Sequence, residues 1–129
     1  MNKQQQADLV ATALEARSMA HAPYSNFLVG AALLATDGTI FRGVNVENAS
    51  YGLTNCAERT AIATAVAAGH RTFAALAVAT AGGVSPCGAC RQVLAEFSKQ
   101  LPIMLVDTER NNAIRQVDLE ALLPDPFSA

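Results

Sequence analysis

The chain has 129 residues, of which 51% are hydrophobic and 16% are charged, and its net charge is −2. This length predicts one compact domain spanning residues 1–129. The chain has no Lys/Arg run, which argues against nucleic acid as a partner. The first residues lack an apolar signal core and the apolar stretches are too short or interrupted to span a membrane, so a cytoplasmic location is expected.

The N-terminal third predicts a helix followed by a hairpin of two strands. Apolar side chains recur at helical spacing over residues 3–20, and Pro23 ends that segment. Residues 27–35 form a nearly continuous apolar run, which is typical of a strand buried on both faces. An Asp-Gly turn signal follows, and residues 40–46 predict the returning strand.

The rest of the chain alternates between helices and strands. The predicted elements are a polar loop at 48–55, a helix at 56–68 closed by Gly69, a strand at 73–80, a loop at 81–86, a helix at 88–98, strands at 102–106 and 113–117 joined through Asn111 and Asn112, and a short last helix capped by Asp118. This order predicts an α/β fold in three layers. A five-stranded mixed sheet is covered by helices on both faces.

The three cysteines predict a zinc site. Cys87 and Cys90 are three residues apart at a predicted helix start, where both sulfurs can reach one ion and the helix dipole favours thiolates. Cys56 also stands at a helix start. Three protein ligands are typical of a catalytic zinc. His21 and His70 lie outside both motifs and are not expected to be ligands.

Other readings of the cysteines remain open at this point. Free cysteines are often buried and inert. A C-x-x-C pair could be a redox dithiol. A non-enzymatic zinc module would need a fourth ligand and a basic or aromatic face, and neither is visible in the sequence.

Glu58, two residues after Cys56, is the candidate acid–base group. The two side chains can face a common centre only if Cys56 stands at the very start of its helix. A carboxylate beside an activated water can take its proton and hand it to a leaving group. Taken alone, Glu58 is better explained as a solvated residue of a first helical turn, where the helix dipole favours a carboxylate. A metal-ligating Cys, a nearby Glu and a later P-C-x-x-C together form the pattern of zinc deaminases.

The chain resembles the cytidine deaminase family, of the short, homotetrameric type with three cysteine ligands. The resemblance covers nearly the whole chain in family order. The matching segments are Tyr24-Ser25, Phe27-x-Val29-Gly30-Ala31-Ala32, Gly43-Val44-Asn45-Val46-Glu47-Asn48-Ala49, Cys56-Ala57-Glu58-Arg59-Thr60-Ala61, Pro86-Cys87-Gly88-Ala89-Cys90-Arg91-Gln92, and Leu122-Leu123-Pro124 with Phe127.

This resemblance implies a hydrolase that converts cytidine and 2′-deoxycytidine to the uridine forms and ammonia in pyrimidine salvage. It implies one Zn²⁺ per subunit, Glu58 as proton shuttle, and a homotetramer that shares its sites. It also implies substrate contacts from Phe27 on the pyrimidine, from Asn45 and Glu47 on the ribose 3′-hydroxyl, and from Ala57. Three further contacts are implied across a subunit boundary: Ala49, Tyr51 and Phe127.

Arg59 has a physical argument of its own. Three thiolates and Zn²⁺ carry a net charge of −1, which should leave a bound water less acidic than at a neutral-ligand site. A guanidinium near the sulfurs would draw charge away and restore that acidity. Arg91 could act similarly and is the weaker candidate.

Two other classes of deaminase are alternatives for this sequence. A blasticidin S deaminase shares the cysteine motifs but lacks the Asn45-x-Glu47 pair, so Glu47 favours a nucleoside substrate. A polynucleotide deaminase needs a cationic track for a strand, and the sequence contains none.

Overall fold

The computed structural model describes residues 1–129, and its elements follow the predicted order. They are α1 (Lys3–Arg17), β1 (Gly30–Ala35), β2 (Ile40–Val44), the 3₁₀ turn η1 (Tyr51–Leu53), α2 (Ala57–Ala67), β3 (Phe73–Thr80), α3 (Gly88–Phe97), β4 (Pro102–Asp107), β5 (Ala113–Asp118) and α4 (Leu119–Leu122). None of these helices is both long and apolar enough to cross a lipid bilayer.

The five strands form one mixed sheet in the order β2-β1-β3-β4-β5. β1 pairs antiparallel with both β2 and β3, and β4 pairs antiparallel with β5. β3 and β4 are parallel, as expected for two strands joined through a helix. The mixed sheet predicted from the sequence is therefore confirmed.

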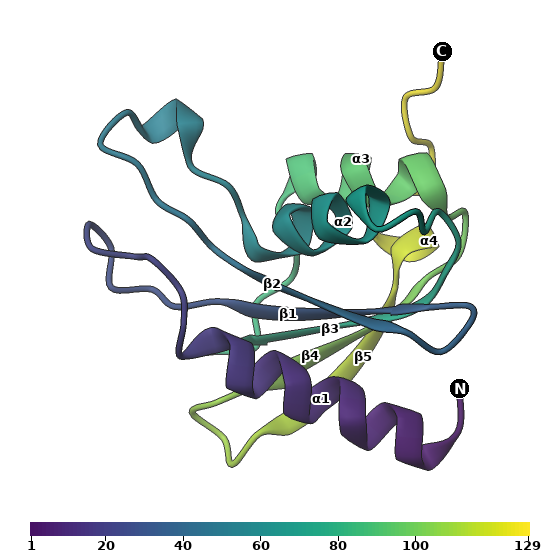
Figure 1. The fold of residues 1–129 in the computed structure, drawn as a ribbon, viewed down its shortest axis with the longest axis horizontal. Coiled ribbons are helices and arrows are strands. Elements are labelled where there is room, and N and C mark those ends of the chain that lie inside the picture. Colours follow the sequence, from purple (N-terminus) through teal and green to yellow (C-terminus); the bar gives the residue numbers. More distant parts are fainter.

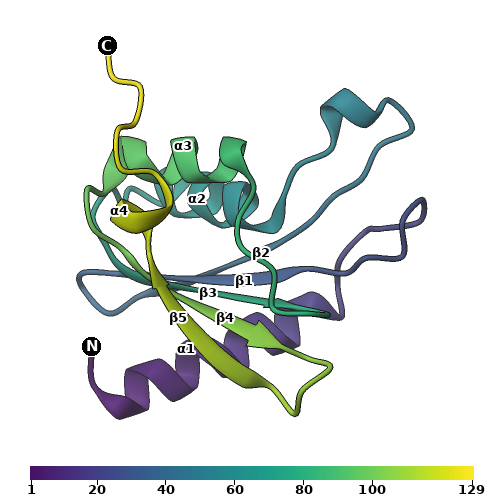
Figure 2. The ribbon, with the colours of Figure 1, turned by 180° about the vertical axis from the view of Figure 1, so that it is seen from behind.

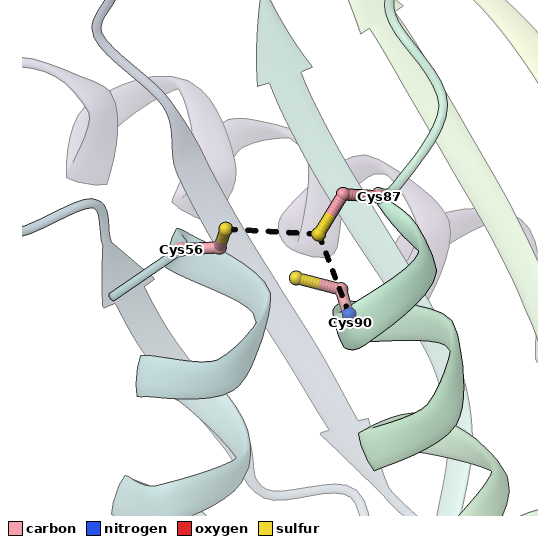
Figure 3. A group of neighbouring side chains, drawn as sticks. All are labelled: Cys56, Cys87 and Cys90. Atoms are coloured by element: carbon pink, nitrogen blue, oxygen red, sulfur yellow. Dashed lines mark hydrogen bonds between the residues drawn. The ribbon is translucent and has the colours of Figure 1, made fainter. Parts of the chain in front are cut away.

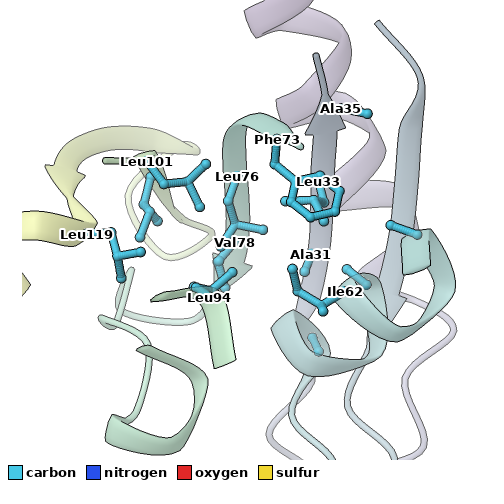
Figure 4. Close-up of a cluster of buried hydrophobic side chains, with 14 of the residues drawn as sticks. Ala31, Leu33, Ala35, Ile62, Phe73, Leu76, Val78, Leu94, Leu101 and Leu119 are labelled. Carbon is cyan, nitrogen blue, oxygen red and sulfur yellow. The ribbon is translucent and has the colours of Figure 1, made fainter. Parts of the chain in front are cut away.

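Helices cover both faces of this sheet, as predicted. α1 lies on one face, and α2, α3 and α4 lie on the other (Figures 1 and 2). Alternating strand residues supply the two cores. Leu33, Leu76 and Val78 face α2 and α3 in the larger core (Figure 4), whereas Ala32 and Ala77 face α1.

Two glycines let helices lie directly on the hairpin strands. A Cβ at Gly43 of β2 would overlap the carbonyl oxygen of Ala57 and crowd the backbone of Ala61, both in α2. A Cβ at Gly30 of β1 would likewise overlap the carbonyl oxygen of Ala13 in α1. Gly43 therefore sets the depth at which the first turn of α2 rests on the sheet.

Some predicted boundaries are wrong, and side-chain contacts explain the main one. The strand predicted at 27–35 begins only at Gly30, because the side chain of Asn45 takes the backbone groups of residues 27 and 29. The helix predicted to Ala20 ends at Arg17, whose guanidinium donates to Leu28 O at 3.0 Å. β2 ends at Val44, two residues before the predicted end.

Two segments extend beyond the same end of the sheet. One comprises residues 20–29, and the other, which we call the arm, comprises residues 45–56 and includes η1 (Figures 1 and 2). Residues 123–129 extend away on the side of α3. The arm leads directly into α2, so its last residue, Cys56, stands at the start of that helix.

Candidate active site

The three cysteine sulfurs meet where two helices begin. Cys56 is the N-cap of α2 and Cys87 the N-cap of α3, while Cys90 lies in the first turn of α3. All three Sγ atoms lie within 4.8 Å of one another, and Cys56 Sγ is 3.9 Å from Cys87 Sγ. Figure 3 shows the sulfurs converging from the two helix starts.

This geometry fits one zinc ion. Tetrahedral zinc with Zn–S bonds of about 2.3 Å holds its sulfurs roughly 3.8 Å apart, close to the observed spacing of Cys56 and Cys87. The ligand cluster contains the three cysteines and no His, Asp or Glu. His70 instead pairs with Asp37 at 2.9 Å. Three sulfur ligands from the protein are the set that the sequence predicted.

The surroundings of the sulfurs favour a thiolate on Cys56. Its pKa is held well below the ordinary thiol value, first because the Cys90 thiol donates to it and next because Arg59 lies beside it. Arg59 Nη2 donates to Cys56 Sγ at 3.3 Å. Arg91 does not contact the sulfurs and instead donates to Pro86 O at 2.8 Å and to Leu122 O at 3.0 Å. Of these two arginines, Arg59 is thus the one that donates to a cysteine sulfur.

Glu58 lies in the first turn of α2 and is only 5% exposed. Burial, and to a lesser degree the nearby Cys56 charge, raises the pKa of its carboxyl above the ordinary value. A carboxyl with a raised pKa keeps its proton to higher pH than an ordinary carboxyl, which suits a group that both accepts and donates protons. Because Cys56 is the N-cap, Glu58 and the Cys56 sulfur both face the same cavity.

That cavity has a volume of about 210 Å³ and reaches from the sulfurs to the segment before β1. Its walls come from α2, β3, the loop before α3 and the segments around Phe27 and Asn45. The lining residues are Phe27, Val29, Asn45, Thr54, Asn55, Cys56, Ala57, Glu58, Val78, Thr80, Val84, Ser85 and Cys87. The cavity thus joins a buried carboxyl group and two cysteine sulfurs to an aromatic ring.

Sequence reasoning missed one wall of this cavity. Val78 and Thr80 stand at the end of β3, and Val84 and Ser85 lie in the loop leading to Cys87. Ligands of α/β proteins bind beyond the carboxyl ends of parallel strands. The end of the strand predicted at 73–80 was therefore a usable signal for this wall.

Asn45 and Glu47 both contact the segment before β1. Asn45 Nδ2 donates to Phe27 O at 2.7 Å, and its Oδ1 accepts from Val29 N at 2.9 Å. Glu47 Oε1 accepts from the backbone N–H groups of Tyr24 at 2.9 Å and Ser25 at 3.1 Å. Asn45 lines the cavity, and Glu47 lies outside its wall.

Of the four remaining predicted substrate contacts, one lies at the cavity and three do not. Ala57 lines it, but Ala49, Tyr51 and Phe127 do not. Tyr51 is 76% exposed on the arm, where its ring meets Tyr24 edge to face, and Phe127 is 79% exposed in the C-terminal segment. Within one chain these three residues do not form part of the site.

Comparisons with known proteins agree on one family. Residues 3–105 match the profile described as the cytidine and deoxycytidylate deaminase zinc-binding region. A cytidine deaminase of Sporosarcina psychrophila is 54% identical over 123 residues, which are 93% of this chain and 89% of that protein. One from Halalkalibacterium halodurans is 48% identical, over 94% and 92% of the two chains. A crystal structure of cytidine deaminase from Burkholderia pseudomallei superposes with a TM-score of 0.89 at 50% identity, covering 98% of this chain and 100% of that one.

Proposed function

Because the chain belongs to the cytidine and deoxycytidylate deaminase family, we propose that it hydrolyses cytidine and 2′-deoxycytidine to uridine and 2′-deoxyuridine plus ammonia. The observation that carries this proposal is the meeting of three cysteine sulfurs with the buried Glu58 at one cavity. In this proposal the zinc ligands are Cys56, Cys87 and Cys90. The 129 residues act as one catalytic domain, which the single continuous sheet supports.

Glu58 moves the protons of this reaction. Zinc, when bound, supplies a Lewis acid that makes water a nucleophile near neutral pH. Glu58 takes a proton from the attacking water and donates it to N3 of the cytosine. It then takes the second proton of that water from the hydroxyl newly bonded to C4 and passes it to the amino group, which leaves C4 as ammonia. The raised pKa of its buried carboxyl suits a group that is alternately acid and base.

The cavity orients the pyrimidine ring beside Glu58. Phe27 packs against the ring, and Ala57 lies next to Glu58 where the ring enters. Asn45 and Glu47 hold the ribose 3′-hydroxyl at the outer end of the site. Arg59 draws charge from the Cys56 sulfur through its hydrogen bond and so keeps the metal centre acidic.

The assembly we infer is a homotetramer in which Ala49, Tyr51 and Phe127 of one subunit complete the site of another. Exposed aromatic side chains on the arm and in the C-terminal segment support it. The cavity volume of about 210 Å³ is also below the ~300–1,000 Å³ of typical small-molecule sites. A cytoplasmic role in pyrimidine salvage completes the proposal.

The second candidate among deaminases, an enzyme acting on blasticidin S, receives less support. The relatives reported above are named cytidine deaminases. Glu47 is also held in place by hydrogen bonds, as expected of a residue that binds a sugar hydroxyl.

Metal analysis paired with a cytidine assay tests the proposal directly. We expect one zinc per chain and a change in ultraviolet absorbance when the purified protein meets cytidine. Cys56→Ser should lose both the zinc and the activity, because two sulfurs do not complete the site. A zinc-loaded protein that leaves cytidine unchanged while deaminating blasticidin S would favour the second candidate.

A further inference from the structure

The turn before β1 is built around the carboxylate of Glu47. Asn26 N donates to Ala22 O at 2.9 Å, and the left-handed conformation of Asn26 (φ 58°) ends this single helical turn. The backbone N–H groups of Tyr24 and Ser25, both in this turn, donate to Oε1 of Glu47. One carboxylate oxygen is therefore saturated by the backbone.

The other oxygen, Oε2, is held by the side chain of Ser25. A backbone N–H can only donate, so the bond from Phe27 N to Ser25 Oγ at 3.0 Å uses an acceptor position of that hydroxyl. The single hydroxyl proton is then free for Glu47 Oε2, to which Ser25 Oγ donates. This bond is also the largest cause of the lowered pKa of Glu47.

These contacts leave a defined place for one more donor. A carboxylate accepts about four hydrogen bonds, and three positions of Glu47 are filled by Tyr24 and Ser25. The remaining lone pair is on Oε2, the oxygen whose direction Ser25 sets. A substrate hydroxyl that binds Glu47 must take that position.

Ser25 also connects Glu47 to the aromatic wall of the cavity. Its hydroxyl accepts from Phe27 N, while Asn45 holds Phe27 O and Val29 N from the other side. Phe27 and Asn45 both line the cavity. The Ser25 hydroxyl is thus hydrogen-bonded both to the Glu47 carboxylate and to the backbone of Phe27, whose ring packs on the pyrimidine.

We propose that Ser25 is a positioning residue that aims Glu47 Oε2 at the sugar hydroxyl and thereby sets the preference for nucleosides with a 3′-hydroxyl. The inference rests on the proposed role of Glu47 and adds a residue that acts through it. Ser25 itself does not line the cavity.

Two substrates that differ only at the 3′ position test this role: 2′-deoxycytidine and 2′,3′-dideoxycytidine. The readout is the ratio of their kcat/KM values. We expect Ser25→Ala to lower this ratio about tenfold, because a hydrogen bond to a charged group is lost. The loss should come from a higher KM for 2′-deoxycytidine, and Ser25→Thr, which keeps the hydroxyl, should restore the ratio.

Ser18→Ala is the matched control, because Ser18 is an exposed serine whose hydroxyl donates only to Glu15 O. Its ratio should equal that of the wild type. In a Glu47→Gln background, Ser25→Ala should lower the ratio no further, since both changes act on one contact. Melting temperatures of all variants report whether each is folded.

The outcomes separate this inference from the function on which it rests. A wild type that does not prefer 2′-deoxycytidine removes Glu47 as a sugar clamp, and the role of Ser25 with it. A wild type with that preference and an unchanged ratio in Ser25→Ala overturns the Ser25 role alone. Equal loss on both substrates also overturns it, because that result describes a merely structural serine.

Discussion

The metal end of the site and the substrate end are built differently. Cys90 and Glu58 are buried, and they start from helices that rest on the sheet. Tyr51 and Phe127 are the most exposed of the large apolar side chains and lie on segments that leave the sheet. The side chains proposed to hold zinc and to move protons are thus fixed within one chain. In the proposed assembly, the side chains that enclose the substrate are placed by a second copy.

The largest effect should follow from a change at the buried end. Glu58→Gln keeps the size of the side chain and removes its ability to carry a proton, so we expect kcat to fall by about 10²–10⁴. Zinc content and substrate affinity should remain, as measured by metal analysis and equilibrium binding. Glu120→Gln, in the short helix α4, is the control and should leave kcat unchanged. Near-normal turnover in Glu58→Gln would remove it as the proton carrier.

The packing beneath the metal end can be broken selectively. Gly43→Ala forces α2 away from β2, and we expect a loss of about 1–3 kcal/mol of unfolding free energy together with weaker zinc retention. Gly30→Ala creates a similar clash with α1 on the opposite face and should lose stability without losing zinc. Gly52→Ala meets open space and serves as the unperturbed control. Equal zinc affinity in the first two variants would contradict a role of Gly43 in placing Cys56.

Removing the arginine beside the sulfurs should lower activity less than removing the Glu58 carboxyl. Arg59→Ala removes the hydrogen bond to Cys56 Sγ, and we expect activity to fall about 10- to 100-fold while at least part of the zinc is kept. Arg71→Ala is the comparison variant, because Arg71 is an exposed arginine in the loop between α2 and β3. Unchanged kinetics in Arg59→Ala would exclude it from the charge-balancing account.

The smallest change in the stability of the chain is expected from a substitution in the exposed C-terminal segment. Phe127→Ala should change stability by no more than about 0.5 kcal/mol, because the side chain is 79% exposed, yet it should raise KM. Mixing Phe127→Ala with Glu58→Gln subunits sharpens the comparison. If Phe127 acts across a subunit boundary, hybrid assemblies contain sites with both native residues and regain a low KM. A mixture no better than its separate components would place Phe127 in its own subunit's site.

Local sequence pattern predicted the elements well and the long-range contacts poorly. The strand at 73–80 and the helix starts at both cysteine motifs are where the sequence indicated, since apolar runs and capping positions are local signals. The shift of the first strand to Gly30 depends on Asn45, a residue far along the chain. Hydrogen bonds between residues this far apart produce no periodic pattern in the sequence from which they could be predicted.

The candidate site divides in the same way. The spacing of Cys87 and Cys90 predicted that they could share an ion, because residues three apart meet on one helical turn. Cys56 was also predicted, because it is the other cysteine at a helix start, and the fold brings α2 and α3 to one face of the sheet where the sulfurs meet. The hydroxyl of Ser25 and the wall at Thr80 depend on loops that meet only in the folded chain.

The sulfur cluster has a thermodynamic consequence as well as a chemical one. Cys56 and Cys87 are 31 positions apart, so an ion that binds both ties the ends of a segment containing all of α2 and β3. A cross-link of this kind restricts the unfolded chain, and a ligand bound only to the native state raises stability by mass action. Chelation should therefore lower the melting temperature, with the two helix starts released before the sheet itself opens.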